Sequence, residues 1–103
     1  MRSTAINKTS LIEGLKQHSL EIRSYGVTSL GLFGSFVKNT ATEKSDIDLL
    51  VEFEPRQKTF DNFMELSFFL ENLFGRKIEL VTRQSLSKYI GPHILKEVEN
   101  VGI

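Results

Sequence analysis

The sequence has no cysteine among its 103 residues. A chain without thiols can form neither a disulfide framework nor a thiolate metal site. It also has no apolar stretch near the roughly 20 residues that a membrane-spanning helix needs. The first ten residues lack the apolar segment that is typical of a secretory signal. We therefore expect a cytoplasmic protein.

A net charge is also missing, because 13 Lys and Arg residues balance 13 Asp and Glu residues. Proteins dedicated to nucleic acid are usually basic, since neutralisation of phosphates supplies most of their non-specific affinity. Nucleic acid is therefore a disfavoured partner. With 40% hydrophobic and 25% charged residues, the composition is that of an ordinary globular protein. The length predicts one domain over residues 1–103, with a core at about residues 10–99.

Apolar spacing and turn residues predict an alternation of helices and strands. The first helix is predicted to begin with a capping box formed by Ser10 and Glu13 and to end at Gly26. The predicted elements are a helix at 10–25, a strand at 27–33, a short helix or turn after it, a strand at 47–53, a helix at 60–74 ending at Gly75, a strand at 76–82 and a helix beginning near Pro92. This order indicates an α/β (α+β) fold, a small mixed sheet of about three strands with helices packed on it.

The predicted helix at 60–74 is apolar over much of its circumference, with five phenylalanines among its 15 residues. A helix that is apolar on most sides is usually buried. We therefore expect this helix to be largely buried in the core or to cover a partner.

Two aspartates, Asp46 and Asp48, stand where the strand at 47–53 begins. Side chains at i and i+2 share a face of a strand, so the two carboxylates project together, away from the apolar residues. Carboxylates this close repel each other unless a cation lies between them. Mg²⁺ prefers one or two carboxylates plus substrate phosphates, and two such ions roughly 3.5–4 Å apart would stabilise a phosphoryl displacement. Taken alone, the pair is equally well explained as a loop cap and a solvated strand end.

A glycine–serine pair, Gly34 and Ser35, closes the preceding strand. Glycine permits a tight turn and lets a phosphate approach the backbone, while the start of a helix offers donors where anions are favoured. In isolation the pair would be an ordinary turn. Together with Asp46 and Asp48 it predicts a nucleotide site, with a phosphate cradle at one strand end and a metal site on the next strand.

A third carboxylate is needed to bridge a metal or to accept a proton from an attacking hydroxyl. Glu79 is the candidate, because its neighbours Ile78 and Leu80 are predicted to point to the opposite face of the strand at 76–82. The alternative is a glutamate in solvent on an edge strand.

This pattern resembles the signature of the polymerase-β-like nucleotidyltransferase superfamily, a Gly-Ser pair followed after ten residues by Asp-x-Asp. A second block, FGRKIELVTRQSLSKYIGPHILKEV, resembles the second half of the minimal nucleotidyltransferases. Together the resemblance covers roughly residues 25–99. It implies the polymerase-β-like fold and a Mg²⁺-dependent transfer of a nucleotidyl group, usually AMP from ATP, with release of pyrophosphate.

The resemblance also implies functional residues and a partner. The matching positions are Asp46, Asp48 and Glu79 for catalysis and metal binding, and Gly34 and Ser35 for the nucleotide phosphates. Lys38 lies in the run after the serine, where this sequence differs from the usual family pattern, and we expect it to keep positive charge near the phosphates. Minimal nucleotidyltransferases are commonly antitoxins paired with a HEPN-domain toxin, which is an RNase. The resemblance therefore implies an antitoxin of a type VII-like pair that transfers AMP to a tyrosine of such a toxin.

Two other functions stay open at this point. The chain could be a weak or inactive nucleotide-binding antitoxin that neutralises the toxin by binding alone. It could also be a transferase acting on RNA or a small molecule, although the zero net charge argues against RNA. The intact aspartate pair favours the enzyme over the binding module.

Overall fold

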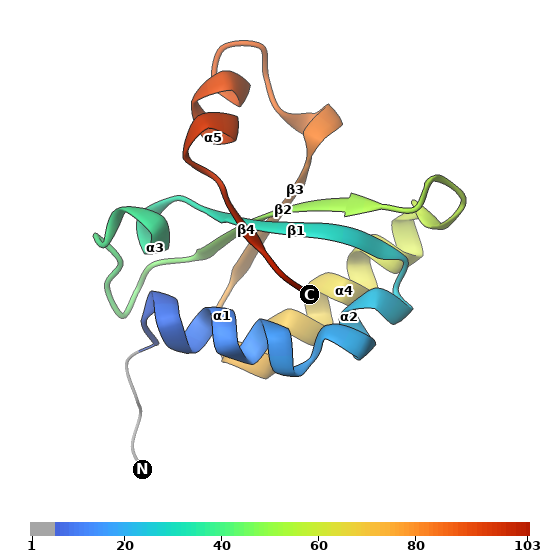
Figure 1. The fold of residues 1–103 in the computed structure, drawn as a ribbon, viewed down its shortest axis with the longest axis horizontal. Coiled ribbons are helices and arrows are strands. Elements are labelled where there is room, and N and C mark those ends of the chain that lie inside the picture. The colour runs from blue at the N-terminus through green and yellow to red at the C-terminus, as the bar shows by residue number, and fades with distance from the viewer. Residues whose placement is uncertain (1–5) are drawn as a thin grey trace.

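A computed structural model describes residues 6–103, so residues 1–5 of the expected domain lie outside the described residues (Figure 1). Its helices and strands are α1 (Lys8–Gln17), α2 (Ser19–Ser24), β1 (Val27–Phe33), α3 (Ser35–Lys38), β2 (Ile47–Phe53), α4 (Phe60–Phe74), β3 (Ile78–Thr82), α5 (Gly91–Glu97) and β4 (Glu99–Val101). Short 3-10 turns at Pro55–Gln57 and Arg83–Ser85 follow β2 and β3.

The four strands form one sheet in the order β3-β2-β1-β4. β2 and β3 are parallel, whereas β1 is antiparallel to both β2 and β4. The predicted mixed sheet is therefore confirmed, and the predicted bounds of β1 and β2 agree with the structure. The expected count of three strands is one too low, because β4 has only three residues and no alternating apolar pattern to reveal it.

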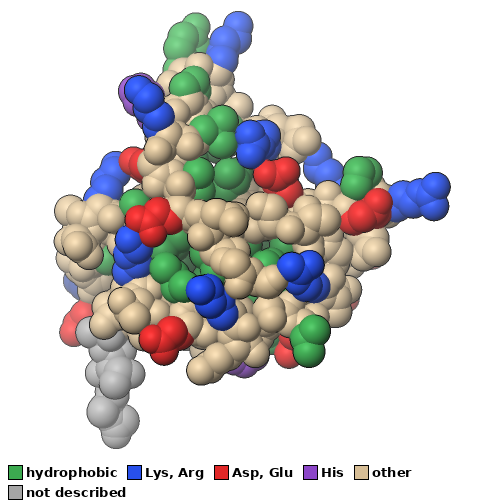
Figure 2. Space-filling view, in the orientation of Figure 1, with side chains coloured by type: hydrophobic (Ala, Val, Ile, Leu, Met, Phe, Trp, Pro, Cys, Tyr) green, Lys and Arg blue, Asp and Glu red, His purple; other side chains and the backbone are tan. Residues whose placement is uncertain are grey.

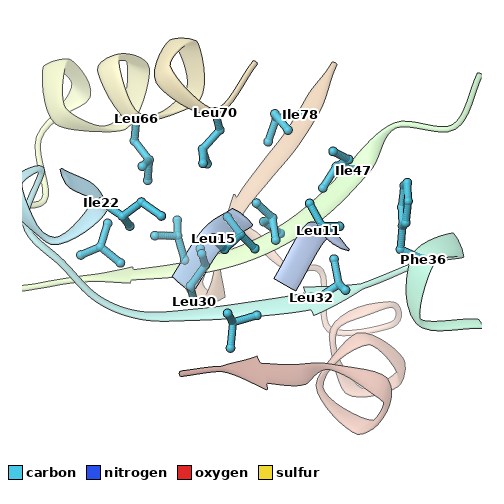
Figure 3. Close-up of a cluster of buried hydrophobic side chains, with 14 of the residues drawn as sticks. Leu11, Leu15, Ile22, Leu30, Leu32, Phe36, Ile47, Leu66, Leu70 and Ile78 are labelled. Carbon is cyan, nitrogen blue, oxygen red and sulfur yellow. The ribbon is translucent and has the colours of Figure 1, made fainter. Parts of the chain in front are cut away.

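Helices α1, α2 and α4 cover one face of the sheet, and α5 stands above the other face (Figure 1). The core lies between the covered face and these three helices, where leucines and isoleucines of both layers interlock (Figure 3). The fully buried members are Leu11, Leu15, Ile22, Leu30, Leu32, Ile47, Leu49, Val51, Leu66 and Leu70. Burial of each such side chain stabilises the fold by roughly 1.5–3 kcal/mol.

The N-terminal helical region differs from the prediction of a single helix that begins at Ser10. α1 begins at Lys8, and the capping box joins Asn7 and Ser10: Asn7 Oδ1 accepts a 2.8 Å hydrogen bond from the Ser10 amide. Ser10 is thus the third residue of the helix and Glu13 has no part in the cap. The helix breaks at His18, where the imidazole Nδ1 lies 2.9 Å from the Gly14 carbonyl oxygen, and α2 follows.

Helix α4 has the predicted bounds, with Thr59 as its N-cap and Gly75, at φ 64°, as its C-cap. Its burial is narrower than expected. Only Leu66 and Leu70 are fully buried, while Phe60 and Phe68 expose 77% and 56% of their surface. Burial in the core therefore does not account for one side of α4, and the other expectation, that the helix covers a partner, stays a prediction. Within residues 6–103, no helix has the length and apolar character required to cross a membrane.

Candidate active site

The turn between β1 and α3 lies against the aspartate pair. Gly34 has φ 79° and ψ −150°, a backbone conformation that residues with a side chain rarely adopt. A methyl group on Gly34 would also overlap the Oδ2 atom of Asp48, which lies opposite Phe33 in the neighbouring strand. Glycine is therefore required here for its backbone angle and for the space that the carboxylate occupies. This contact brings two motifs separated by ten residues into one place.

Asp46 and Asp48 directly precede and follow Ile47, the first residue of β2. Ile47 and Leu49 are fully buried in the core, whereas both aspartates are half-buried. The strand therefore turns Ile47 and Leu49 toward the helices. Asp48, and after it Leu50, lie on the face that α1, α2 and α4 leave uncovered. The predicted separation of Ile47 and Asp48 onto opposite faces agrees with the structure, whereas Asp46 precedes β2 and its projection together with Asp48 stays a prediction.

Glu79 lies directly beside Asp48 across the parallel pair of β2 and β3. It is exposed, while the preceding residue, Ile78, is buried in the core. Adjacent residues in register share a face of the sheet, so Glu79 lies on the same open face as Asp48. The structure thus places Asp46, Asp48 and Glu79 at one end of two neighbouring strands.

These carboxylates affect the protonation of Asp48. Partial burial, and after it the negative charges of Glu79, Asp46 and Glu97, raise the pKa of Asp48 to about 6 from an ordinary value of 3.8. Both causes disfavour the ionised form. A bound divalent cation would offset this cost, because it places a positive charge among the carboxylates.

The oxygen donors of this site fit Mg²⁺, which prefers carboxylates and phosphates to nitrogen or sulfur ligands. In the described part of the chain, no three or more acidic or histidine side chains come together as a complete metal-binding group. Mg²⁺ commonly takes only one or two carboxylates and completes its shell with water and substrate phosphates. Asp46 and Asp48 suit that mode, and Glu79 as a third metal ligand stays a prediction.

Glu97, at the end of α5, is a member of this site that sequence reasoning missed. Its Oε1 atom accepts a hydrogen bond of 3.4 Å from the Gly34 amide, and its Oε2 atom lies 3.5 Å from Lys38 Nζ. Lys38, expected at the nucleotide phosphates, thus lies at the edge of the site and pairs with Glu97. No local signal identifies Glu97, because it follows Asp48 by 49 residues and belongs to another element.

A cavity of about 200 Å³ lies farther along the same open face. It is lined by Ser29, Gly31, Leu50, Glu52, Arg83, Val98 and Asn100. Leu50 is two residues after Asp48 in β2, so the cavity begins one side-chain row from the carboxylates. An ion pair of 3.0 Å between Arg83 and Glu52 borders it. The open face therefore offers a recess beside the acidic cluster.

Comparison with known proteins agrees with this architecture. The model of the nucleotidyltransferase domain family matches residues 11–102. The chain is 41% identical to the protein adenylyltransferase MntA of Thermococcus cleftensis over 85 residues, which are 82% of this chain and 85% of that protein. It is 37% identical over 89 residues to a candidate protein adenylyltransferase of Methanocaldococcus jannaschii, covering 84% of this chain and 86% of that protein.

Solved structures show the same fold. The structure of a candidate minimal nucleotidyltransferase superposes with a TM-score of 0.80 at 26% identity, covering 94% of this chain and 98% of that chain. A chain from a toxin–antitoxin structure with AMP-PNP superposes with a TM-score of 0.63 at 20% identity, covering 94% of this chain and 73% of that chain. The second likeness shows the fold alone.

The fold and these matches identify this chain as an enzyme that transfers nucleotidyl groups. This chain belongs to the nucleotidyltransferase domain family and, within it, to the minimal nucleotidyltransferases.

Proposed function

We propose that this chain is an antitoxin of a type VII-like pair that transfers AMP from ATP to a tyrosine of a HEPN-domain RNase toxin. The observation that carries the proposal is the contact between Gly34 and Asp48, which joins the turn and the acidic cluster into one site. Two further facts support it. The relatives above are named protein adenylyltransferases, and a chain of the same fold comes from a toxin–antitoxin structure with AMP-PNP.

In the proposed reaction the tyrosine oxygen attacks the α-phosphorus of ATP. A bond forms between that oxygen and phosphorus, the bond to the bridging oxygen breaks, and pyrophosphate leaves. Mg²⁺, when bound, supplies positive charge for the phosphates and for the leaving pyrophosphate. Most of the catalysis comes from positioning and from charge neutralisation.

The roles of this chain's residues follow from their places on the open face. Asp46 and Asp48 hold the cation, with two ions as the proposed number. Glu79 completes the acidic site and accepts the phenolic proton. Gly34 and Ser35 hold the triphosphate at the turn, and Lys38 contributes positive charge at its edge. ATP is abundant in the cytoplasm, where we propose that the protein acts.

The test is transfer of AMP to the toxin encoded by the adjacent reading frame. The purified chain is mixed with that toxin, Mg²⁺ and labelled ATP, and intact mass spectrometry follows the toxin. We expect a mass increase of AMP on a tyrosine and loss of RNase activity. Asp46→Asn and Asp48→Asn should each lower the rate by at least about 10²-fold, because a misplaced catalytic group already costs that much.

Asp61→Asn is the matched control, since Asp61 is exposed at the start of α4 and far from the open face. It should transfer AMP at the wild-type rate. Absence of transfer by the wild type, together with full neutralisation of the toxin by Asp48→Asn, would establish the alternative, in which the chain inactivates the toxin by binding alone.

A further inference from the structure

The segment between β3 and β4 projects from the open face and exposes large apolar side chains. We call residues 83–96 the α5 arm; it runs from the turn after β3 to the residue before Glu97, the last residue of α5 (Figure 1). Tyr89, Ile90 and Leu95 expose 81%, 60% and 38% of their surface. Single exposed apolar residues are common, but three within seven consecutive residues of one projection are typical of an interaction surface.

The charge of the α5 arm differs from that of the whole chain. Arg83, Lys88 and Lys96 give it three positive charges, and it has no Asp or Glu, although the full chain is neutral. Within residues 6–103, neither Lys88 nor Lys96 forms an ion pair with a carboxylate. In Figure 2, hydrophobic and basic side chains gather at the tip of the arm, at the top of the view. An acidic surface would complement this segment.

The turn that carries Tyr89 and Ile90 in the α5 arm is stabilised by contacts within the arm. The Gly91 amide donates a 2.7 Å hydrogen bond to the Ser87 carbonyl, and the Ile90 amide donates to Ser87 Oγ at 3.0 Å. Gly91 is buried, and a methyl group there would lie 3.2 Å from Leu86 Cβ. These contacts order the turn at residues 86–91, so a partner that binds there loses less conformational entropy.

Both ends of the α5 arm lie at the open face of the sheet, close to the candidate active site. At its start, Arg83 lines the cavity beside the acidic cluster, together with Val98 from beyond its end. The residue that follows the arm, Glu97, contacts Gly34 and Lys38. A protein bound to the arm would therefore lie next to the carboxylates, where its hydroxyl must arrive.

We infer that the α5 arm docks the acceptor protein of the reaction through an acidic surface that carries apolar side chains. This inference rests on the proposed function, because it assumes a protein acceptor. Tyr89, Ile90 and Leu95 form the apolar centre of the contact, and Lys88 and Lys96 form its charged rim. Two of the three residues of this centre, Ile90 and Leu95, are aliphatic, which favours a protein over RNA, because RNA is bound mainly through phosphates and through bases stacked on aromatic side chains.

The experiment compares variants of the arm with matched variants elsewhere. Tyr89→Ser/Ile90→Ser removes the apolar centre, and Phe60→Ser removes an equally exposed phenylalanine from α4. Lys88→Glu reverses a charge on the arm, and Lys16→Glu reverses one on α1. The readouts are the Kd for the adjacent-frame toxin by calorimetry and the KM for that toxin at saturating ATP. Circular dichroism verifies that every variant is folded.

We expect Tyr89→Ser/Ile90→Ser to raise Kd and KM for the toxin by about tenfold or more, with kcat and the KM for ATP unchanged. Lys88→Glu should raise both about threefold at low salt and less at high salt, since exposed charges are screened. Phe60→Ser and Lys16→Glu should behave as the wild type. A KM for the toxin that is unchanged in both arm variants would overturn the inference.

The outcomes separate this inference from the proposed function. Toxin binding by the wild type without AMP transfer would overturn the proposed function, and the Kd of the arm variants would still show whether the arm docks the toxin. Two further measurements test other occupants of the arm. The first is the affinity for a single-stranded RNA oligonucleotide, and the second is self-association of the chain, followed by sedimentation. Loss of RNA binding or of dimers in Tyr89→Ser/Ile90→Ser, with toxin affinity intact, would overturn docking of the acceptor.

Discussion

At the scale of single residues, Asp48 is held in an environment that disfavours its charge. It is half-buried beside Gly34, and Glu79, Asp46 and Glu97 add negative potential. A carboxylate that is costly to ionise is a poor contributor to stability and a strong site for a cation. Residues retained at such a cost are frequently functional.

Replacement of Asp48 by asparagine should therefore stabilise the metal-free protein at neutral pH while it abolishes transfer. The pKa of Asp48 is raised to about 6 in the fold and lies near 3.8 when the chain is unfolded. Between pH 3.8 and pH 6 Asp48 is protonated in the folded state but ionised in the unfolded state. The free energy of unfolding of the wild type therefore falls as pH rises through this window, and above pH 6 it stays below its value at low pH. Allowing for solvent screening, we expect Asp48→Asn to gain about 1 kcal/mol at pH 7.5.

Urea unfolding of both proteins in EDTA, at pH 3.5 and pH 7.5, measures this difference. The gain should become small at pH 3.5, where Asp48 is protonated in the folded state and mostly protonated in the unfolded state. An Asp48→Asn variant that is less stable than the wild type at pH 7.5 would show that the carboxylate makes a favourable interaction instead.

Gly34 is the second residue whose replacement should separate two physical effects. Alanine there meets a strained backbone angle and overlaps Asp48 Oδ2, whereas Gly75, at φ 64°, has nothing within 4 Å of an added methyl group. The backbone strain alone costs about 1–2 kcal/mol. We expect Gly75→Ala to lose about that much stability, and Gly34→Ala to lose more and also to lose transferase activity. Urea unfolding and the AMP-transfer assay measure the two quantities, and equal losses of stability would contradict the contact with Asp48.

At the scale of elements, α4 has one buried and one exposed side. Leu66 and Leu70 are fully buried against the sheet, while Phe60 and Phe68 face outward. A phenylalanine-rich helix therefore has fewer core residues than its composition indicates. Periodicity shows that one side is apolar, but the number of layers packed around the helix decides how many of its sides are covered.

The two sides of α4 should respond differently to truncation. Leu66→Ala should destabilise the protein by about 2–5 kcal/mol, because it removes buried methyl groups and leaves a cavity. Phe68→Ala should change the free energy of unfolding by only about 0.5 kcal/mol, the usual size for an exposed position. Urea unfolding with a common slope measures both, and a large loss for Phe68→Ala would show that this side of α4 is covered in solution.

At the scale of the whole molecule, ligand binding and folding are linked through the open face. A ligand that binds only the folded state at 100 times its Kd stabilises it by about 2.7 kcal/mol. For a domain of about 100 residues, this corresponds to a rise in Tm of roughly 10 °C. We therefore expect Mg²⁺ with ATP to raise the Tm of the wild type by this order.

Three controls define that measurement. Addition of EDTA should remove most of the shift in Tm, and Asp48→Asn should show less than half of it, because the cation loses a carboxylate. The control Asp61→Asn should keep the full shift. An equal shift in Asp48→Asn and in the wild type would place the nucleotide away from the aspartate pair.

Some features of this protein are determined by the sequence itself. The bounds of β1 and β2, the C-cap at Gly75 and the opposite orientation of Ile47 and Asp48 were all predictable. Each depends on neighbours within a few residues, where strand alternation and backbone preferences act. The resemblance of the Gly-Ser and Asp-x-Asp motifs to a known family was likewise readable, and the comparisons confirm it.

Only the tertiary structure decided which distant residues meet. The close approach of Asp48 to Gly34, the contacts of Glu97 with Gly34 and Lys38, and the addition of β4 to the sheet all join residues from separate elements. The exposure of one side of α4 and the projection of the α5 arm from the sheet also depend on how the elements pack, and the sequence does not reveal them. Local patterns set the direction of each side chain on its own element, whereas contacts between elements depend on how the whole chain packs. The Gly-Ser turn and the aspartates therefore become one site only when β1 and β2 pair.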